Sequence, residues 1–178
     1  MSDQRLAVAE VAALLRAAGA ALRAEAGALP ERVLRHHPAP GEWCVKEVIG
    51  HLIEAERRGF AGRIRHILAA DRPPLQAWDQ DAVAHERRDC ERAAGDLLAE
   101  LATLRDDSVA LVAGLQAADL SRGGQHPRVG FLTVGDLVQE WVHHDRNHLR
   151  QMLENVRDFV WPAMGAAQRF SGGAATRP

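Results

Sequence analysis

The sequence has no tyrosine, few aromatic residues and only two cysteines among its 178 residues. Cys44 and Cys90 stand far apart and in no spacing typical of metal ligands. They therefore exclude a disulfide framework and a cysteine zinc site, and they suit a reducing cytoplasm. No apolar run approaches the roughly 20 residues that a membrane span requires, and no basic leader precedes an apolar stretch. We expect a cytoplasmic protein without a membrane partner.

An excess of charge of one sign is also lacking. The chain carries 22 Lys and Arg residues against 24 Asp and Glu residues, for a formal net charge of -2. No basic field is available to attract nucleic acid, so nucleic acid is not an expected partner. Hydrophobic residues make up 47% of the chain and charged residues 26%, which is typical of a globular protein. The length favours one domain, which we place at residues 1–165.

Strand patterns with alternating polarity are missing, and helical periodicity marks four long segments instead. The expected helices cover about residues 3–27, 42–70, 89–117 and 133–160. Thr133 is a plausible N-cap for the last of them, since its side chain can accept a hydrogen bond from the first turn. The Gly- and Ala-rich residues 166–178 are expected to form a flexible C-terminal tail.

Four amphipathic helices of similar length pack most simply as a four-helix bundle, so the fold class is all-α. A helix of roughly 27 residues is about 40 Å long. The segment 71–88 can span that distance if it is extended, at about 3.3 Å per residue. Helices two and three can therefore run parallel, joined by a crossover. The other connections are only modestly shorter, so chain length alone leaves the topology open.

Histidines are the residues most indicative of chemistry. His144 and His148 lie four apart on the apolar face of the last helix, where two imidazoles can share one metal ion. The alternative is a pair of core histidines bonded to polar neighbours, or one buried and one exposed. His51, in a row of small residues on the second helix, can supply a third nitrogen. Three protein ligands with open positions are typical of a catalytic site, although His51 alone would be assigned to the surface.

Two motifs together resemble a known family. Residues 42–52, EWCVKEVIGHL, followed by Glu56, resemble the "W-s-x-x-E-v-l-g-H-l" segment of the DinB-like superfamily, which includes YfiT-like metalloenzymes. Residues 144–151, HDRNHLRQ, resemble the second signature of the family, "H-D-x-x-H-l-x-Q". The resemblance covers about residues 6–159, and the two histidine motifs together are fairly specific.

The resemblance implies both a topology and a ligand set. The family fold is an up-down-down-up bundle with a crossover between helices two and three. Its metal ligands correspond to His51, His144 and His148. Characterised members are metal-dependent enzymes that use low-molecular-weight thiols, either as S-transferases or as a maleylpyruvate isomerase. Other members come from genes induced by DNA damage, and the family often forms dimers, so a homodimer is expected here.

Four further residues are candidates for the surroundings of the site. Gln151 can face the same cavity as His148, and Asp145 can orient a neighbouring group. Glu47 precedes His51 by four residues and can accept an imidazole N–H, although exposure is the simpler reading. His126 lies in a loop that leads to the last helix and can line the mouth of the site. The alternative for Gln151 is an ordinary polar position on the helix, and for Glu47 and His126 it is an exposed position on the surface.

The leading hypothesis is a metal-dependent enzyme with one mononuclear three-histidine site, either a low-molecular-weight-thiol S-transferase or a related hydrolase or isomerase. Its partners would be a small-molecule substrate and a small thiol rather than Cys44 or Cys90. The ion would be zinc, nickel, iron or manganese, because imidazole suits several metals. The alternative is a non-enzymatic stress or DNA-damage-induced protein with a vestigial or structural site. The free imidazoles are expected to titrate near their usual pKa of about 6.5.

Overall fold

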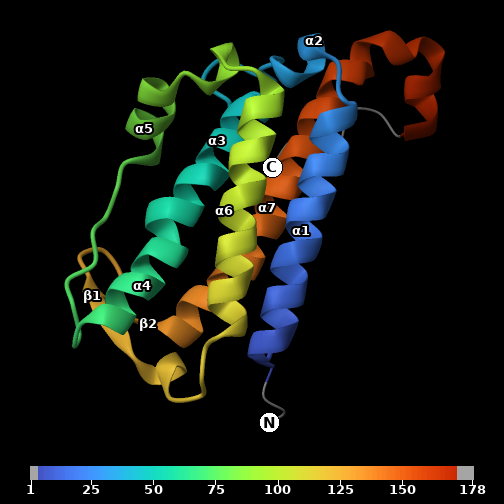
Figure 1. The fold of residues 1–178 in the computed structure, drawn as a ribbon. Helices are drawn as coiled ribbons and strands as arrows, with labels where there is room; N and C mark the ends of the chain where they lie inside the picture. Colours follow the sequence, from blue (N-terminus) through green and yellow to red (C-terminus); the bar gives the residue numbers. More distant parts are fainter. Residues whose placement is uncertain (1–3, 172–178) are drawn as a thin grey trace.

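The computed structural model describes residues 4–171 and confirms the four-helix bundle (Figure 1). Its first and last long helices are continuous, whereas the second is divided by a π-helical turn. The long elements are α1 (Val8–Ala28), α3 (Val45–Glu54) with η1 (Ala55–Gly59) and α4 (Ala61–Ala69), α6 (Ala94–Ala113) and α7 (Val134–Val160). Thr133 caps α7 as expected, because its Oγ1 accepts a hydrogen bond from the Asp136 N–H at 3.0 Å.

The chain follows a course in which two consecutive long helices descend. In Figure 1, α1 rises from the N-terminus, α3 and α4 descend, the connection rises again along one side, α6 descends and α7 rises. Helices α1 and α3 each pack chiefly against α6 and α7. The two helices that carry His51 and the His144–His148 pair, α3 and α7, are therefore direct neighbours in the bundle.

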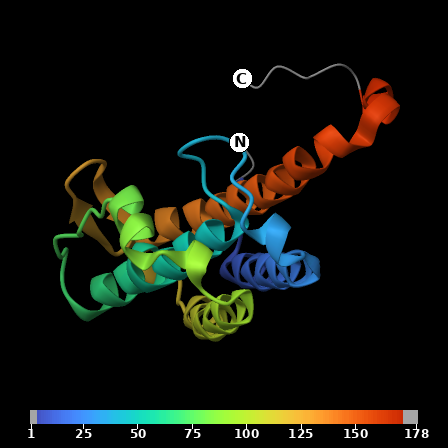
Figure 2. The ribbon, with the colours of Figure 1, turned by 90° about the horizontal axis from the view of Figure 1, so that it is seen from above.

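Shorter elements connect and extend the bundle. Helix α2 (Glu31–Leu34) follows α1; α5 (Gln80–Arg87) and η2 (Asp89–Glu91) belong to the crossover; η3 (Asp119–Ser121) follows α6; and η4 (Trp161–Ser171) follows α7. Figure 2 shows η4 projecting beyond the bundle at the end of α7. The first residues of the expected tail, 166–171, belong to η4, and the rest of the expected tail lies outside the described residues. No described helix is both long and apolar enough to cross a membrane.

A small β-hairpin corrects the expectation of a purely helical chain. Strands β1 (Gly123–His126) and β2 (Gly130–Thr133) pair antiparallel just before α7, with Gly123 opposite Thr133. Glycine at both 123 and 124 hides the alternation by which strands are recognised. Glycine is required there, since a Cβ on Gly123 would lie 2.4 Å from the Leu132 carbonyl oxygen. The hairpin brings His126 to the end of the bundle near α4.

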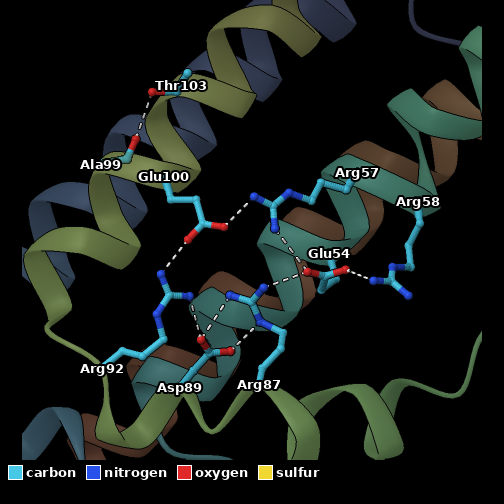
Figure 3. A network of polar contacts seen from close by, with 9 residues as sticks. All are labelled: Glu54, Arg57, Arg58, Arg87, Asp89, Arg92, Ala99, Glu100 and Thr103. Carbon is cyan, nitrogen blue, oxygen red and sulfur yellow. Dashed lines mark hydrogen bonds and ion pairs between the residues drawn. The ribbon is translucent and has the colours of Figure 1, made fainter.

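A network of ion pairs fastens the crossover to the bundle (Figure 3). Arg87 Nη1 lies 2.6 Å from Glu54 Oε1 on α3, and Arg87 Nε lies 2.6 Å from Asp89 Oδ2. Arg92 bridges Asp89, at 3.0 Å, and Glu100 on α6, at 2.7 Å. The buried carboxylates are each matched by guanidinium groups, which offsets their desolvation. The crossover is thereby fixed to α3 and to α6.

The core has two apolar clusters with a charged layer between them. One surrounds Trp141 and the other surrounds Leu22 and Met152. Between them Arg105 Nη2 lies 2.6 Å from Glu56 Oε1, and both side chains are at most 4% exposed. Burial raises the pKa of Glu56 to about 7, although Arg105 and the Ser108 hydroxyl oppose that rise. This layer lies beside the histidines of α7, because Asp145 belongs to it.

The two cysteines also differ from expectation. The Cys44 and Cys90 sulfurs are joined in a disulfide, with the Cα atoms 6.9 Å apart. The separation of 46 residues concealed this pairing. The crossover returns the chain to the start of α3, so η2 places Cys90 beside Cys44. The expectation that the spacing of the two cysteines excludes a disulfide is therefore wrong.

Candidate metal centre

Three histidines meet between α3 and α7. One ligand nitrogen from each of His51, His144 and His148 lies within 4.8 Å of the others. The Nε2 atoms of His51 and His144 are 3.0 Å apart. In α7 the spacing of four residues places both imidazoles on the face toward α3, with ring centroids 4.4 Å apart. The structure thus brings together the three residues that the sequence singled out as ligands.

The electrostatics of the cluster keep the imidazoles neutral. Burial lowers the pKa of His51 to about 3, and His148 contributes to the effect. Burial is also the main reason that the pKa of His144 falls to about 2, followed by repulsion from His148 and His51. Burial lowers the pKa of His148 as well, against an opposing hydrogen bond with Gln151. The expectation of titration near 6.5 is wrong because α3, α7 and aromatic side chains remove these rings from water.

Aromatic rings enclose the cluster on several sides. Trp43 lies 4.9 Å from the His51 ring and Trp78, in the crossover, lies 5.6 Å from it, measured between centroids. The rings of Phe60 and His144 pack in a T-shaped arrangement, with their centroids 5.1 Å apart. These rings come from the N-terminal side of α3, the crossover and the end of the π-helix. They limit the access of water and hold the imidazole planes by packing.

The π-helix after α3 helps to place Phe60. The Phe60 N–H donates to the Ala55 carbonyl oxygen at 2.7 Å. The two residues are five positions apart, which is the hydrogen-bond spacing of a π-helix. Gly62 permits the tight turn, since a Cβ there would lie 2.0 Å from the Arg57 carbonyl oxygen. The extra residue rotates α4 relative to α3, so that Phe60 stacks on Trp141 with centroids 5.0 Å apart.

The four residues expected around the ligands have different positions. Gln151 Oε1 lies 2.9 Å from His148 Nδ1; an amide oxygen accepts, so Nδ1 carries the proton and Nε2 presents its lone pair. Asp145 forms its ion pair with Arg105. Glu47 accepts the Cys44 N–H at 2.8 Å at the start of α3, away from His51. His126 lines the cavity described next.

An open cavity of about 1500 Å³ leads to the histidines. His51 and His144 form part of its wall, together with Trp78 from the crossover and His126 from the hairpin. Arg63 Nη2 lies 3.0 Å from the Gln76 carbonyl oxygen and 3.3 Å from His126 Nε2. The cavity joins α3, α4, α7, the crossover and the hairpin, and its volume is large enough for a small organic molecule.

The donor set fits a divalent transition metal. Metal–nitrogen bonds of about 2.0–2.1 Å place two ligands of one ion roughly 3 Å apart, close to the 3.0 Å between the Nε2 atoms of His51 and His144. Neutral imidazole is the form that coordinates metal. The Nδ1 atoms of His51 and His144 are buried without a protein hydrogen-bond partner, which leaves both rings free to present Nε2. Zinc, nickel and iron all suit such a site.

Fold and site together define a four-helix bundle with a three-histidine centre, and sequence comparison places the chain in a family. Residues 14–152 match the DinB superfamily, and the chain belongs to it. YuaE of Bacillus subtilis is 27% identical over 143 residues, covering 71% of this chain and 85% of that protein. OB0782 of Oceanobacillus iheyensis, named as a candidate metal-dependent hydrolase, is 24% identical over 121 residues, 68% of this chain and 69% of that protein.

A solved structure has the same fold. YfiT from Bacillus subtilis, described as a probable metal-dependent hydrolase with an unusual four-helix bundle topology, superposes with a TM-score of 0.80. The match covers 90% of this chain and 94% of YfiT at 20% sequence identity. At that identity the similarity establishes the architecture, and the chemistry has to be argued from the residues of this chain.

Sequence reasoning missed two residues near the site. Arg105 lies on the apolar face of α6, four residues from both Leu101 and Val109. An arginine within an apolar stripe is a sequence pattern that could have indicated a buried charge. Arg63 carried no such signal, because it is an ordinary charged residue in a helix with other arginines. Its place in the cavity depends on the hairpin, which brings His126 to it.

Proposed function

We propose that this protein is a metal-dependent enzyme in which His51, His144 and His148 hold one divalent transition-metal ion. The observation that carries the proposal is the convergence of three neutral imidazoles, two of which, His51 and His144, line an open cavity. Three protein ligands leave coordination positions free for water or substrate. The descriptions of OB0782 and YfiT as metal-dependent hydrolases support the same class. Hydrolysis of a small molecule is the reaction that we favour.

The chemistry depends on both the ion and the chain. A bound divalent ion would lower the pKa of a coordinated water or thiol and polarise the bond under attack. Gln151 fixes the tautomer of His148, and the Asp145–Arg105 pair fixes α7 at the position of His144. Trp43 and Trp78 keep bulk water from His51, which strengthens electrostatic interactions inside the site. Substrate would enter from the side of the cavity that the hairpin and crossover line.

Arg63 indicates the charge of the substrate. Among residues 4–171 no carboxylate pairs with its guanidinium, and its Nε is buried without a hydrogen-bond partner. Burial lowers the pKa of Arg63, as expected for a cation that lacks a counter-ion. An anionic group in the cavity would supply that counter-ion and a two-point hydrogen bond. We therefore propose a small substrate with a carboxylate or a similar anionic group.

Within this class, transfer of a low-molecular-weight thiol is the finer proposal. A thiol is activated by a divalent ion in the same way as water, so both reactions use the same site. Cys44 and Cys90 cannot be the nucleophile in this form, since their sulfurs are joined to each other and neither residue lines the cavity. The thiol would therefore be a second small molecule. We also propose that the protein acts in the cytoplasm as a homodimer.

Metal analysis of untagged protein is the direct test. We expect one equivalent at the three-histidine centre, and its loss in His148→Ala because two nitrogen ligands cannot hold the ion tightly. His85→Ala is the matched control, since His85 is exposed on α5. The loaded protein should hydrolyse members of a panel of anionic esters and amides, and activity should disappear on chelation. Full metal content in His148→Ala would contradict the ligand assignment. Metal binding without turnover of esters, amides or thiol–electrophile pairs would favour a non-enzymatic metal-binding protein.

A further inference from the structure

A second group of metal-binding side chains lies at the start of α3, apart from the three-histidine centre. It consists of His37, Cys44, Glu47 and Cys90, whose ligand atoms all lie within 4.8 Å of one another. Cys44 precedes His51 by seven residues, which is about 10 Å along a helix axis. None of the four residues lines the cavity of the three-histidine centre. The two groups are therefore separate sites.

We propose that the dithiol form of this protein binds one Zn²⁺ ion through Cys44, Cys90 and His37, with Glu47 as the nearest further oxygen donor. Two thiolates and an imidazole are a donor set that zinc favours over magnesium or calcium. This site uses residues from three separate segments: the loop after α2, the N-cap of α3 and η2 of the crossover.

His37 is already oriented as a ligand. Its Nδ1 lies 2.7 Å from the Glu42 carbonyl oxygen, which can only accept a hydrogen bond. Nδ1 therefore carries the proton, and Nε2 presents a lone pair. That Nε2 lies 3.5 Å from Cys90 Sγ. A carbonyl that holds the second ring nitrogen is the usual support of a metal-bound histidine.

The distances agree with tetrahedral zinc. Zn–S bonds of about 2.3 Å and Zn–N bonds of about 2.0–2.1 Å place a sulfur and a nitrogen ligand about 3.5 Å apart. The separation between Cys90 Sγ and His37 Nε2 has this value. The sulfurs of Cys44 and Cys90 need to separate to about 3.8 Å, which side-chain rotation can supply in the reduced form. Glu47 Oε2 accepts the Cys44 N–H at 2.8 Å and lies 3.5 Å from His37 Nδ1, so its carboxylate adjoins the site.

The disulfide and the zinc site are alternative states of one cysteine pair. An added phosphine or thiol reductant supplies two electrons, and two protons from water complete the two thiols. Binding of Zn²⁺ then displaces both protons. The backbone around the pair is held independently of the sulfurs, because Lys46 Nζ donates to the Arg92 carbonyl oxygen at 2.6 Å and also contacts the Cys90 carbonyl oxygen. Reduction therefore leaves the ligands side by side.

The test compares reduced and oxidised full-length protein, loaded with Zn²⁺ or Co²⁺ alone. We expect one more equivalent of zinc in the reduced protein than in the oxidised protein. Reduced protein with Co²⁺ should also show thiolate-to-cobalt charge-transfer absorption, which three histidines cannot produce. His148→Ala should retain this absorption, so failure of the three-histidine centre and failure of this site are distinguishable.

Variants of the accessible ligands complete the test. Cys90→Ser should lose the extra equivalent and the absorption band. His37→Gln should weaken binding by more than about tenfold, since even outer partners of metal ligands contribute about 10–100-fold. His37 is exposed, so this variant should fold, and His66→Gln on the exposed side of α4 is its matched control. Equal zinc content in reduced and oxidised protein, or a reduced cobalt form without thiolate absorption, would overturn the proposal.

Discussion

Arg105 on α6 forms a two-point ion pair with Asp145 on α7, the residue that directly follows His144. Both side chains are at most 4% exposed, and Arg105 Nη1 also donates to the Leu15 carbonyl oxygen at 3.2 Å. Burial opposes the charge on Arg105, but Asp145 and Glu56 outweigh that effect and raise its pKa. The guanidinium of this α6 residue thus links α1, α7 and η1 at the level of the three histidines.

Asp145→Asn should be strongly destabilising. The substitution leaves Arg105 buried with only part of its positive charge compensated, which costs about 3–5 kcal/mol in comparable buried pairs. The free energy of unfolding, measured by urea titration, should fall by that amount. Asp106→Asn, on the exposed side of α6, is the control and should change it by less than about 0.5 kcal/mol. Equal stability of the two variants would show that the buried pair is not needed.

The stability of the metal-free protein should fall as the pH falls from about 6.5. The pKa values of His51 and His144 are lowered to about 3 and about 2 in the folded state. Between those values and about 6.5 the unfolded chain binds protons that the folded chain does not, so acid favours unfolding. Each histidine contributes up to about 1.4 kcal/mol per pH unit in that interval. Urea titrations of chelated protein between pH 4 and 7 measure this slope.

The matched comparison for that slope uses one buried and one exposed histidine. His144→Leu should flatten the pH dependence by about one proton, whereas His66→Leu should leave it unchanged because His66 is exposed. A slope that is the same in both variants would mean that His144 titrates normally in the folded chain.

Removal of metal should leave the bundle folded. The two apolar clusters on either side of the charged layer contain none of the three histidines, so their burial does not depend on the ion. Helical circular dichroism after chelation should stay close to that of the loaded protein. Excess metal should raise the melting temperature because it binds the folded state. At a hundredfold excess over Kd, this binding adds about 2.7 kcal/mol to the free energy of unfolding. Loss of helical signal on chelation would make the ion structural and would contradict an open catalytic site.

Gly50→Ala should destabilise the junction between α3 and the crossover. A Cβ at Gly50 would lie within 2 Å of the Asp89 carboxylate, which Arg87 and Arg92 hold in place. Overpacking of this kind costs about 1–3 kcal/mol. Gly95→Ala is the contrasting control: no atom lies within 4 Å of its Cβ position, so alanine in helix α6 should stabilise by about 0.5–1 kcal/mol. Thermal melting of both variants measures the difference in sign.

The helices and the proximity of His144 to His148 could be predicted because both follow local periodicity. His144 and His148 need only a helix to share a face, and Leu137 and Trp141 show which face is buried. Thr133 was recognisable as a cap for the same local reason. The assignment of His51 required a second helix to be placed opposite, which came from the family resemblance and not from spacing.

The remaining features arise from contacts between distant segments. The Cys44–Cys90 pairing, the Arg63–His126 contact and the Glu56–Arg105–Asp145 layer each join residues at least 40 positions apart. The lowered pKa values of the histidines depend on rings that the crossover and the π-helix supply. Periodicity contains no information on any of these contacts, because it describes one helix at a time.

The packing of α1 against α6 and α7 has a consequence for biosynthesis. Helix α1 meets its main partners late in synthesis, since α3, α4 and the whole crossover are translated before α6. At about 5–20 residues per second, its apolar face, with Val11, Leu15 and Leu22, stays without native cover for several seconds. Native contacts of such long sequence separation also slow folding relative to bundles built from successive hairpins. During that interval the apolar face of α1 is a target for a chaperone.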